Sequence, residues 1–190
     1  MAKQVVADGY KFDFTDAVLD AYVFDSSKYN GVKNKMKSVD IVAEFPQEYL
    51  FIELKKYRPE RGGMEFRCPL WDDKSLIISQ CPLGTDDNKR VKATIKRISH
   101  DLRRKYFDTF LYFFAENKLG DKQVNYICVV EGCEAAQILC LNRILLNVIP
   151  QGIPAQSRWV RPIMNNLAVV NVDEWNKIDI INRYGRCSLI

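Results

Sequence analysis

The sequence predicts an α/β domain in which a mixed central β-sheet is flanked by helices. Three observations lead to this fold class. Short segments rich in β-branched and aromatic residues, such as 38–45 and 49–57, have the composition and period of strands. Longer segments with apolar residues at every third or fourth position, such as 86–105, have the period of helices. The two kinds alternate in the order α-β-β-α-β-α-β, which is typical of a mixed sheet with helices packed on it.

Length and composition indicate a single domain spanning residues 1–190. The chain is 47% hydrophobic and 27% charged, close to the average of soluble proteins, which excludes a disordered or collagen-like chain. Its apolar runs are too short to cross a bilayer, and its first residues lack the apolar stretch of a secretory signal. The 6 cysteines include no C-x-x-C pair. We therefore expect a cytoplasmic protein with reduced cysteines and no membrane partner.

The first third of the chain contains a predicted helix and a predicted hairpin. Thr15 is a candidate N-cap for a helix through DAVLDAYVF, because apolar residues recur there on one helical face. Residues 26–36 have the composition of a loop, with room for a short strand. The segments 38–45 and 49–57 then form a hairpin around the turn signal Pro46-Gln47.

The rest of the chain alternates helices and strands after an irregular insertion. Residues 58–84 contain several Gly and Pro signals, and a loop of this length is usually functional or mobile. The elements expected after it are a helix over 86–105 that continues towards Ala115, a strand at 124–130, a helix at 134–148, a strand at 167–172 and a short helix from Asp173.

A single histidine, His100, limits the chemistry that the chain can perform. Nucleases with two acid–base histidines and HExxH metalloproteases are excluded. The chain contains neither G-x-x-x-x-G-K-[ST] nor G-x-G-x-x-G, so Walker-type and Rossmann-type nucleotide binding is not supported. A zinc site is disfavoured because the cysteines lack close ligand pairs.

The net charge of +4 comes from one short segment. Residues 86–105 hold 8 basic and 3 acidic side chains, while the segments before and after them are close to neutral. A local basic excess on a helix is typical of a surface that contacts phosphates, although many such runs are simply solvated. The candidate nucleic-acid contacts are Lys89, Lys92, Lys96, Arg97, Arg103 and Arg104.

The predicted hairpin gathers acidic residues on one face. If its turn centres on Pro46-Gln47, Asp40 lies opposite Glu53, and alternation places Glu44 and Lys55 on the same face. The other face is uniformly apolar, and we expect it to pack on the helices. Two neighbouring carboxylates can hold a hard divalent cation, and a nearby lysine can orient water or neutralise a phosphate. The alternative is an ordinary solvent-exposed sheet face that has no role in binding or catalysis.

The motif formed by Asp40 and Glu53-Leu54-Lys55, within VDIVAEFPQEYLFIELK, resembles that of the PD-(D/E)XK nuclease superfamily. The resemblance covers about 12–130 and implies a restriction-endonuclease-like α-β-β-β-α-β core, with 131–190 as a C-terminal addition. It further implies that Asp40 and Glu53 bind Mg²⁺ or Mn²⁺, that the Leu54 carbonyl adds a ligand, and that Lys55 is catalytic.

The family often adds an acidic metal ligand from its first helix. Asp16, Asp20 and Asp25 are the candidates here, and we favour Asp20. On this resemblance we expect a metal-dependent nuclease that hydrolyses phosphodiester bonds in nucleic acid, DNA more than RNA, with a homodimer as one possible assembly. The alternatives are a catalytically inactive member of the fold that binds nucleic acid or protein, and a plain interaction domain.

Overall fold

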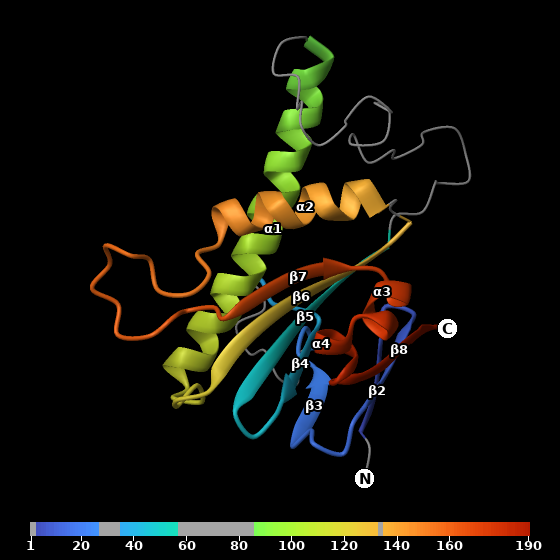
Figure 1. Ribbon diagram of the computed structural model, residues 1–190, viewed down its shortest axis with the longest axis vertical. Coiled ribbons are helices and arrows are strands. Elements are labelled where there is room, and N and C mark those ends of the chain that lie inside the picture. The colour runs from blue at the N-terminus through green and yellow to red at the C-terminus, as the bar shows by residue number, and fades with distance from the viewer. Residues whose placement is uncertain (1–2, 27–34, 57–85, 133–134) are drawn as a thin grey trace.

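The computed structural model describes residues 3–26, 35–56, 86–132 and 135–190 (Figure 1). Within 86–98, and at a few positions of the second helix, it describes the backbone alone. The predicted irregular insertion at 58–84 lies outside the described residues. The elements in chain order are β1 (Gln4–Ala7), β2 (Tyr10–Phe14), β3 (Asp20–Val23), β4 (Ile41–Glu44), β5 (Glu48–Lys56), α1 (Asp86–Ala115), β6 (Gln123–Glu131), α2 (Ala135–Val148), β7 (Asn166–Val170), α3 (Val172–Lys177), α4 (Asp179–Asn182) and β8 (Gly185–Leu189).

A five-stranded mixed sheet in the order β3-β4-β5-β6-β7 forms the centre of the molecule. The first three strands make an antiparallel meander, and β6 and β7 then add parallel strands after α1 and α2. The predicted α/β class with a mixed sheet is therefore confirmed. So is the predicted hairpin, since the register Ile41↔Ile52 brings Asp40 level with Glu53.

The predicted helix after Thr15 is wrong. Instead, the Val18 N–H donates to the Thr15 carbonyl at 3.1 Å in a turn, and β3 follows. Tyr22 and Val23 pair with β4, so strand hydrogen bonds outweigh the local helical pattern. The strand β3 also supplies the first strand of the meander, which the sequence could place only at 31–36. Within 31–36, only 35–36 are described, as turn and bend, and 31–34 lie outside the described residues.

A second sheet, in the order β1-β2-β8, was not predicted. Its β1–β2 turn is Asp8-Gly9, with φ of 49° and 75°, which is the left-handed pair that a two-residue type I′ hairpin needs. The strand β8 then pairs antiparallel with β2 near the C-terminus of the chain. Residues Tyr10, Phe12 and Phe14 of β2 are buried against the large sheet.

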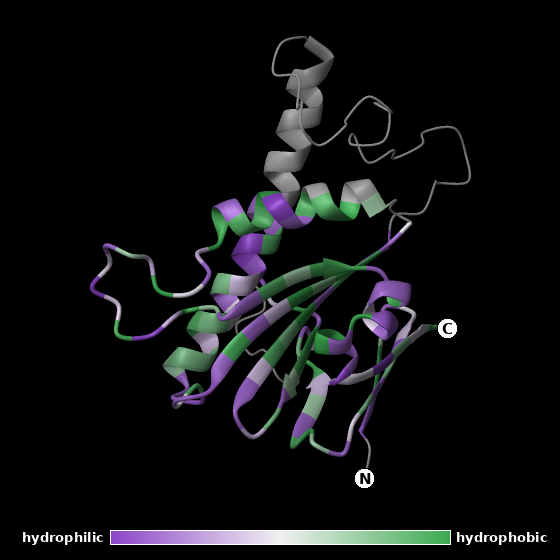
Figure 2. Ribbon diagram, in the orientation of Figure 1, coloured by the Kyte–Doolittle hydropathy of each residue, from purple (hydrophilic) through white to green (hydrophobic). Residues whose placement is uncertain are grey.

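Different elements pack on the two faces of the large sheet. The long helices α1 and α2 pack on the face of Val42, Phe51 and Tyr126. The small sheet and the short helices α3 and α4 pack on the uniformly apolar face of Ile41 and Leu50. The expectation that helices pack on this apolar face holds only for the short α3 and α4, because the unpredicted small sheet covers the rest of it and the long helices lie on the other face. Figure 2 shows the hydrophobic residues that run along β6 and β7 between these two layers.

The helix α1 brings charged residues onto the acidic face of the hairpin. Leu102, Tyr106 and Phe113 are buried in the core between helix and sheet, which agrees with the predicted apolar stripe. The Tyr106 ring lies 6.0 Å from that of Phe51, and this packing fixes the helix over β5. Among the described residues, no helix is long and apolar enough to cross a membrane.

Gly185 provides a test of the unpredicted sheet. Its φ of +132° and the position of the Asp13 carbonyl, 2.2 Å from where a Cβ would lie, leave no room for a side chain. We expect Gly185→Ala to lower the free energy of unfolding by about 2–4 kcal/mol in urea titrations. Gly152→Ala is the matched control, because Gly152 has a φ of +70° but nothing within 4 Å. Equal losses in the two variants would contradict the close packing of β8 on β2.

A buried carboxylate pair as the candidate functional site

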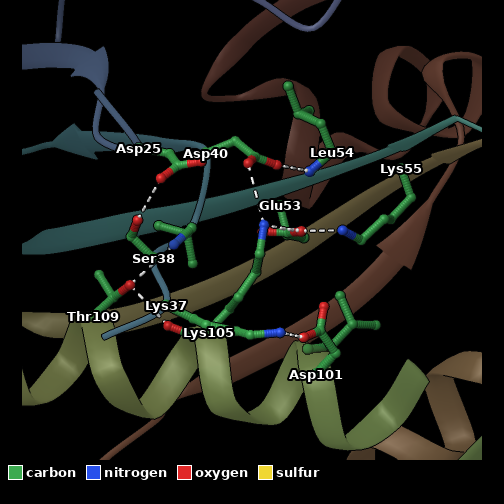
Figure 3. A network of polar contacts seen from close by, with 12 residues as sticks. Asp25, Lys37, Ser38, Asp40, Glu53, Leu54, Lys55, Asp101, Lys105 and Thr109 are labelled. Carbon is green, nitrogen blue, oxygen red and sulfur yellow. Dashed lines mark hydrogen bonds and ion pairs between the residues drawn. The ribbon is translucent and has the colours of Figure 1, made fainter. Parts of the chain in front are cut away.

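Asp40 lies immediately before β4 and completes the strand ladder with its side chain. Its own N–H donates to the Ile52 carbonyl at 3.1 Å. Its Oδ2 accepts the Leu54 N–H at 2.6 Å (Figure 3). The carboxylate thus takes the place of the backbone carbonyl that would accept this bond if the pairing of β4 with β5 continued. Leu54, whose carbonyl the resemblance implies as a ligand, is therefore beside the carboxylate. These bonds fix Asp40 next to the middle of β5.

Glu53 is enclosed between β5 and α1, with 0% of the residue exposed. Its Oε1 accepts two ion pairs, from Lys105 Nζ at 2.6 Å and from Lys55 Nζ at 2.7 Å. Its other oxygen, Oε2, has no hydrogen-bond donor among the described residues. A buried carboxylate oxygen without a donor is costly, so Oε2 marks a position where a cation or another donor would fit.

Lys105 is the residue that the sequence analysis missed. From α1 it reaches Glu53 and also Asp40, with 3.3 Å between Nζ and Asp40 Oδ1, and only 15% of its side chain is exposed. Its neighbour Tyr106 is in the buried stripe, so Lys105 flanks the core instead of pointing to solvent like Arg103. A lysine beside an apolar stripe, opposite a strand with two carboxylates, was the available signal.

Burial and charge act in opposite directions on the two carboxylates. Burial is the largest effect on both, and it raises the pKa of Asp40. Burial and the Asp40 charge together raise the pKa of Glu53 to about 7, against the lowering effect of Lys55 and Lys105. The two carboxylates in turn raise the pKa of Lys105 above its ordinary value, despite burial. Lys105 therefore stays protonated at pH 7, whereas Glu53 gains or loses its proton near that pH.

A ring of polar contacts holds the segment before β4 onto α1. The Lys37 N–H donates to Asp108 at 2.9 Å, and the Lys37 ammonium pairs with Asp101. The Val39 N–H donates to the Thr109 hydroxyl at 3.1 Å. Figure 3 shows Lys37, Asp101 and Thr109 below the carboxylate pair, so the contacts position Asp40 from the helix side.

Two predicted members of the cluster lie elsewhere. Asp20 is at the opposite end of β3, across from Glu44, and its carboxylate pairs with Lys3 at 2.6 Å. Glu44 is likewise at the far end of β4, where it pairs with Lys122 at 2.6 Å. The structure therefore does not bring Asp20 to the Asp40–Glu53 pair. The reason is that the segment is a strand, which spreads its residues along the sheet instead of returning them in a helical turn.

The other two acidic candidates differ in position. Asp16 precedes β3 at the same end as Asp20. Asp25 follows β3 at the Asp40 end, where the Ser38 hydroxyl donates to it at 3.0 Å, and Figure 3 shows it beside Asp40. Within the described parts of the chain, no three acidic, histidine or cysteine residues are gathered closely enough to hold a metal ion. The donor set shown is thus a pair of carboxylates.

The structure describes the side chains of only some of the basic residues of α1. Arg103 is exposed and stacks over Phe107, with 5.4 Å to the ring centroid, and Arg104 pairs with Asp108 at 3.3 Å. The side chains of Lys89, Lys92, Lys96 and Arg97 lie outside the described residues, although their backbone is helical. Their role as phosphate contacts stays a prediction.

Comparisons of the chain with protein-family models, with curated proteins and with solved structures returned no match. The site offers two carboxylates as hard oxygen ligands, and the buried Glu53 Oε2 has no donor among the described residues. Lys55, whose side chain is 29% exposed, lies next to Glu53. Such an arrangement can bind a divalent cation and present an ammonium group to an anionic substrate.

The raised pKa of Glu53 makes stability depend on pH. Between the ordinary Glu pKa of 4.5 and the folded value of about 7, the folded state holds more protons than the unfolded chain. The stabilisation from protonated Glu53 is present at the low end of this window and is lost as pH rises through it, by about 3 kcal/mol at most. Urea titrations across the window should show a clearly steeper decline in the wild type than in Glu53→Gln, in which only the raised pKa of Asp40 remains. Parallel profiles for the two proteins would contradict the raised pKa.

Proposed function

We propose that the chain is a divalent-metal-dependent nuclease that hydrolyses phosphodiester bonds in nucleic acid, with DNA as the first substrate to test. The observation that carries the proposal is the side-by-side placement of Asp40 and buried Glu53, with the Glu53 Oε2 left without a donor among the described residues. A carboxylate pair of this kind fits Mg²⁺ or Mn²⁺, which prefer oxygen ligands. A bound cation would activate water and offset the charge of the phosphate.

The order of elements also supports the proposal. The meander β3-β4-β5, the helix α1 and the parallel strand β6 follow one another as the β-β-β-α-β part of the implied core does. The helix that the implied core places first has no counterpart among the described residues before β3, where the β1–β2 hairpin stands. The proposal therefore depends more on the site than on the likeness of the fold.

The residues of the site have separate roles in the proposed reaction. Asp40 and Glu53 hold the cation, with the Leu54 carbonyl as a further ligand. Lys55 is partly exposed and touches Glu53 Oε1, so its ammonium can reach both the scissile phosphate and the attacking water. The basic residues of α1 contact flanking phosphates without reading sequence.

The second candidate function is a catalytically inactive domain that binds nucleic acid or protein. One observation favours it: Lys105 already compensates both carboxylates, with Nζ at 2.6 Å and 3.3 Å from them. In that case the ion pairs hold α1 on the sheet, and no cation is required. The two functions differ in metal binding and in turnover.

Metal binding separates the two functions. We expect the wild type to bind Mn²⁺ in calorimetric titrations, and Asp40→Asn and Glu53→Gln each to weaken binding by about 100-fold, because each variant removes a charged ligand. Glu44→Gln is the matched control, since Glu44 has the same chemistry on the same sheet face but pairs with Lys122. A wild type that binds no Mn²⁺, with or without a short duplex present, would favour the inactive domain.

Turnover tests the role of Lys55. We expect Lys55→Met to reduce DNA cleavage with Mn²⁺ by about 100-fold or more while DNA binding changes little, because the ammonium acts on the reacting groups. Cleavage is measured on labelled single- and double-stranded oligonucleotides, and binding by fluorescence anisotropy in Ca²⁺. Full activity of Lys55→Met would remove Lys55 from the mechanism.

Salt dependence tests the basic face of α1. We expect the double variant Lys89→Gln, Lys96→Gln to reduce the slope of log Kobs against log salt by about 2 in anisotropy titrations, because two phosphate contacts are lost. The control removes the same charge from two exposed lysines elsewhere, Lys118 and Lys177. If both double variants show the same slope, α1 is not the binding face.

A further inference from the structure

We infer that Lys105 is a resident counter-ion that occupies the cation position of the site, and that a divalent metal binds by displacing its ammonium group towards Asp101. This inference rests on the proposed function, because it concerns the same carboxylate pair. It goes further by assigning a role to a residue of α1 that the Asp40, Glu53 and Lys55 motif does not contain.

Geometry places the ammonium between the two carboxylates. Lys105 Nζ is 2.6 Å from Glu53 Oε1 and 3.3 Å from Asp40 Oδ1, whereas Lys55 contacts Glu53 alone among these two. A metal ion that bridges two carboxylate oxygens lies about 2.0–2.6 Å from each of them. A metal ion that bridged Glu53 Oε1 and Asp40 Oδ1 would therefore overlap the ammonium, and a metal held by both Glu53 oxygens, including Oε2, would lie close enough to repel it.

Charge balance leads to the same conclusion. The two carboxylates and the ammonium groups of Lys55 and Lys105 together form a neutral set of two negative and two positive charges. A divalent cation added to this set, in an enclosed position, would leave an excess of two positive charges at short range. Removal of the Lys105 ammonium from the oxygens relieves that repulsion and frees the ligands.

The helix offers Lys105 a second partner. Asp101 lies one helical turn earlier, and an acid four residues before a lysine is the favourable order for a pair on a helix. The Asp101 carboxylate now pairs with Lys37 and is 32% exposed, so it has capacity for another donor. The lysine side chain has four flexible carbons, and this movement needs only a change of rotamers. Figure 3 shows Asp101 on α1 beside the Lys105 side chain.

The test compares Mn²⁺ affinity in Lys105→Met and Lys55→Met. Both variants remove one positive charge and one contact to Glu53 Oε1, but only Lys105→Met removes the contact to Asp40. We expect calorimetry to show Mn²⁺ binding at least about tenfold tighter in Lys105→Met than in the wild type, because the competing cation is gone. The gain in Lys55→Met should be clearly smaller.

Three results would overturn the inference. Equal gains in both variants would show that charge, not position, controls affinity. Unchanged or weaker Mn²⁺ binding in Lys105→Met, with binding still abolished in Glu53→Gln, would leave the metal site standing but make Lys105 a supporting residue. No Mn²⁺ binding in any variant, including Lys105→Met with a short duplex present, would reject both the inference and the proposed nuclease.

A second variant covers the case in which Lys105→Met does not fold. Asp101→Asn keeps both carboxylates and removes the negative charge that receives the displaced ammonium, and Lys37→Met is its control because it breaks the same ion pair but keeps that charge. We expect it to weaken Mn²⁺ binding about threefold to tenfold, while the melting temperature without metal stays within a few degrees of the wild type. Unchanged Mn²⁺ affinity in Asp101→Asn would contradict displacement towards Asp101.

Discussion

The enclosure of Glu53 between the sheet and α1 is the constraint on which the site depends. A charged carboxylate in that position is tolerated only with compensating charge, and Lys105 and Lys55 supply it at 2.6 Å and 2.7 Å. Lys105 can do so only if α1 is held with residue 105 above β5, which the burial of Leu102 and Tyr106 achieves. Packing and electrostatics are thus coupled, because the same helix contributes both the core and the counter-charge.

The Asp40–Glu53 pair could be predicted from sequence because both residues belong to one hairpin. Alternation fixed which side chains share a face, and the two-residue turn at Pro46-Gln47 fixed the register, as the bond from the Phe45 N–H to the Glu48 carbonyl at 2.8 Å shows. The buried stripe of α1 could be predicted for the same reason, since it depends on residues three and four apart. The periodicity of neighbouring residues was therefore sufficient to predict both the carboxylate pair and the buried stripe of α1.

The rest of the fold depends on contacts between distant segments. The residues of β3 fit a helix as well as a strand, and the pairing of Tyr22 with Val42 decides between them. The strand β8 is short and pairs with β2 across most of the chain length. The alternation of Tyr10, Phe12 and Phe14 after Asp8-Gly9 does indicate a strand, and it is the local signal from which β2 could have been predicted. Lys105 could not be distinguished from solvated lysines by period alone, because its partners come from the sheet.

The bond from the Leu54 N–H gives the Asp40 carboxylate a structural role that is independent of the proposed metal binding. Because Asp40 closes the end of the strand ladder, its loss removes a buried hydrogen bond whether or not the chain is an enzyme. A chain of this fold without any catalytic activity would still need an acid there for folding. Lys55, with its side chain partly in solvent and paired with Glu53, contributes less to the fold. Under the proposed function, the residue at position 55 would therefore report catalytic activity better than the residue at position 40.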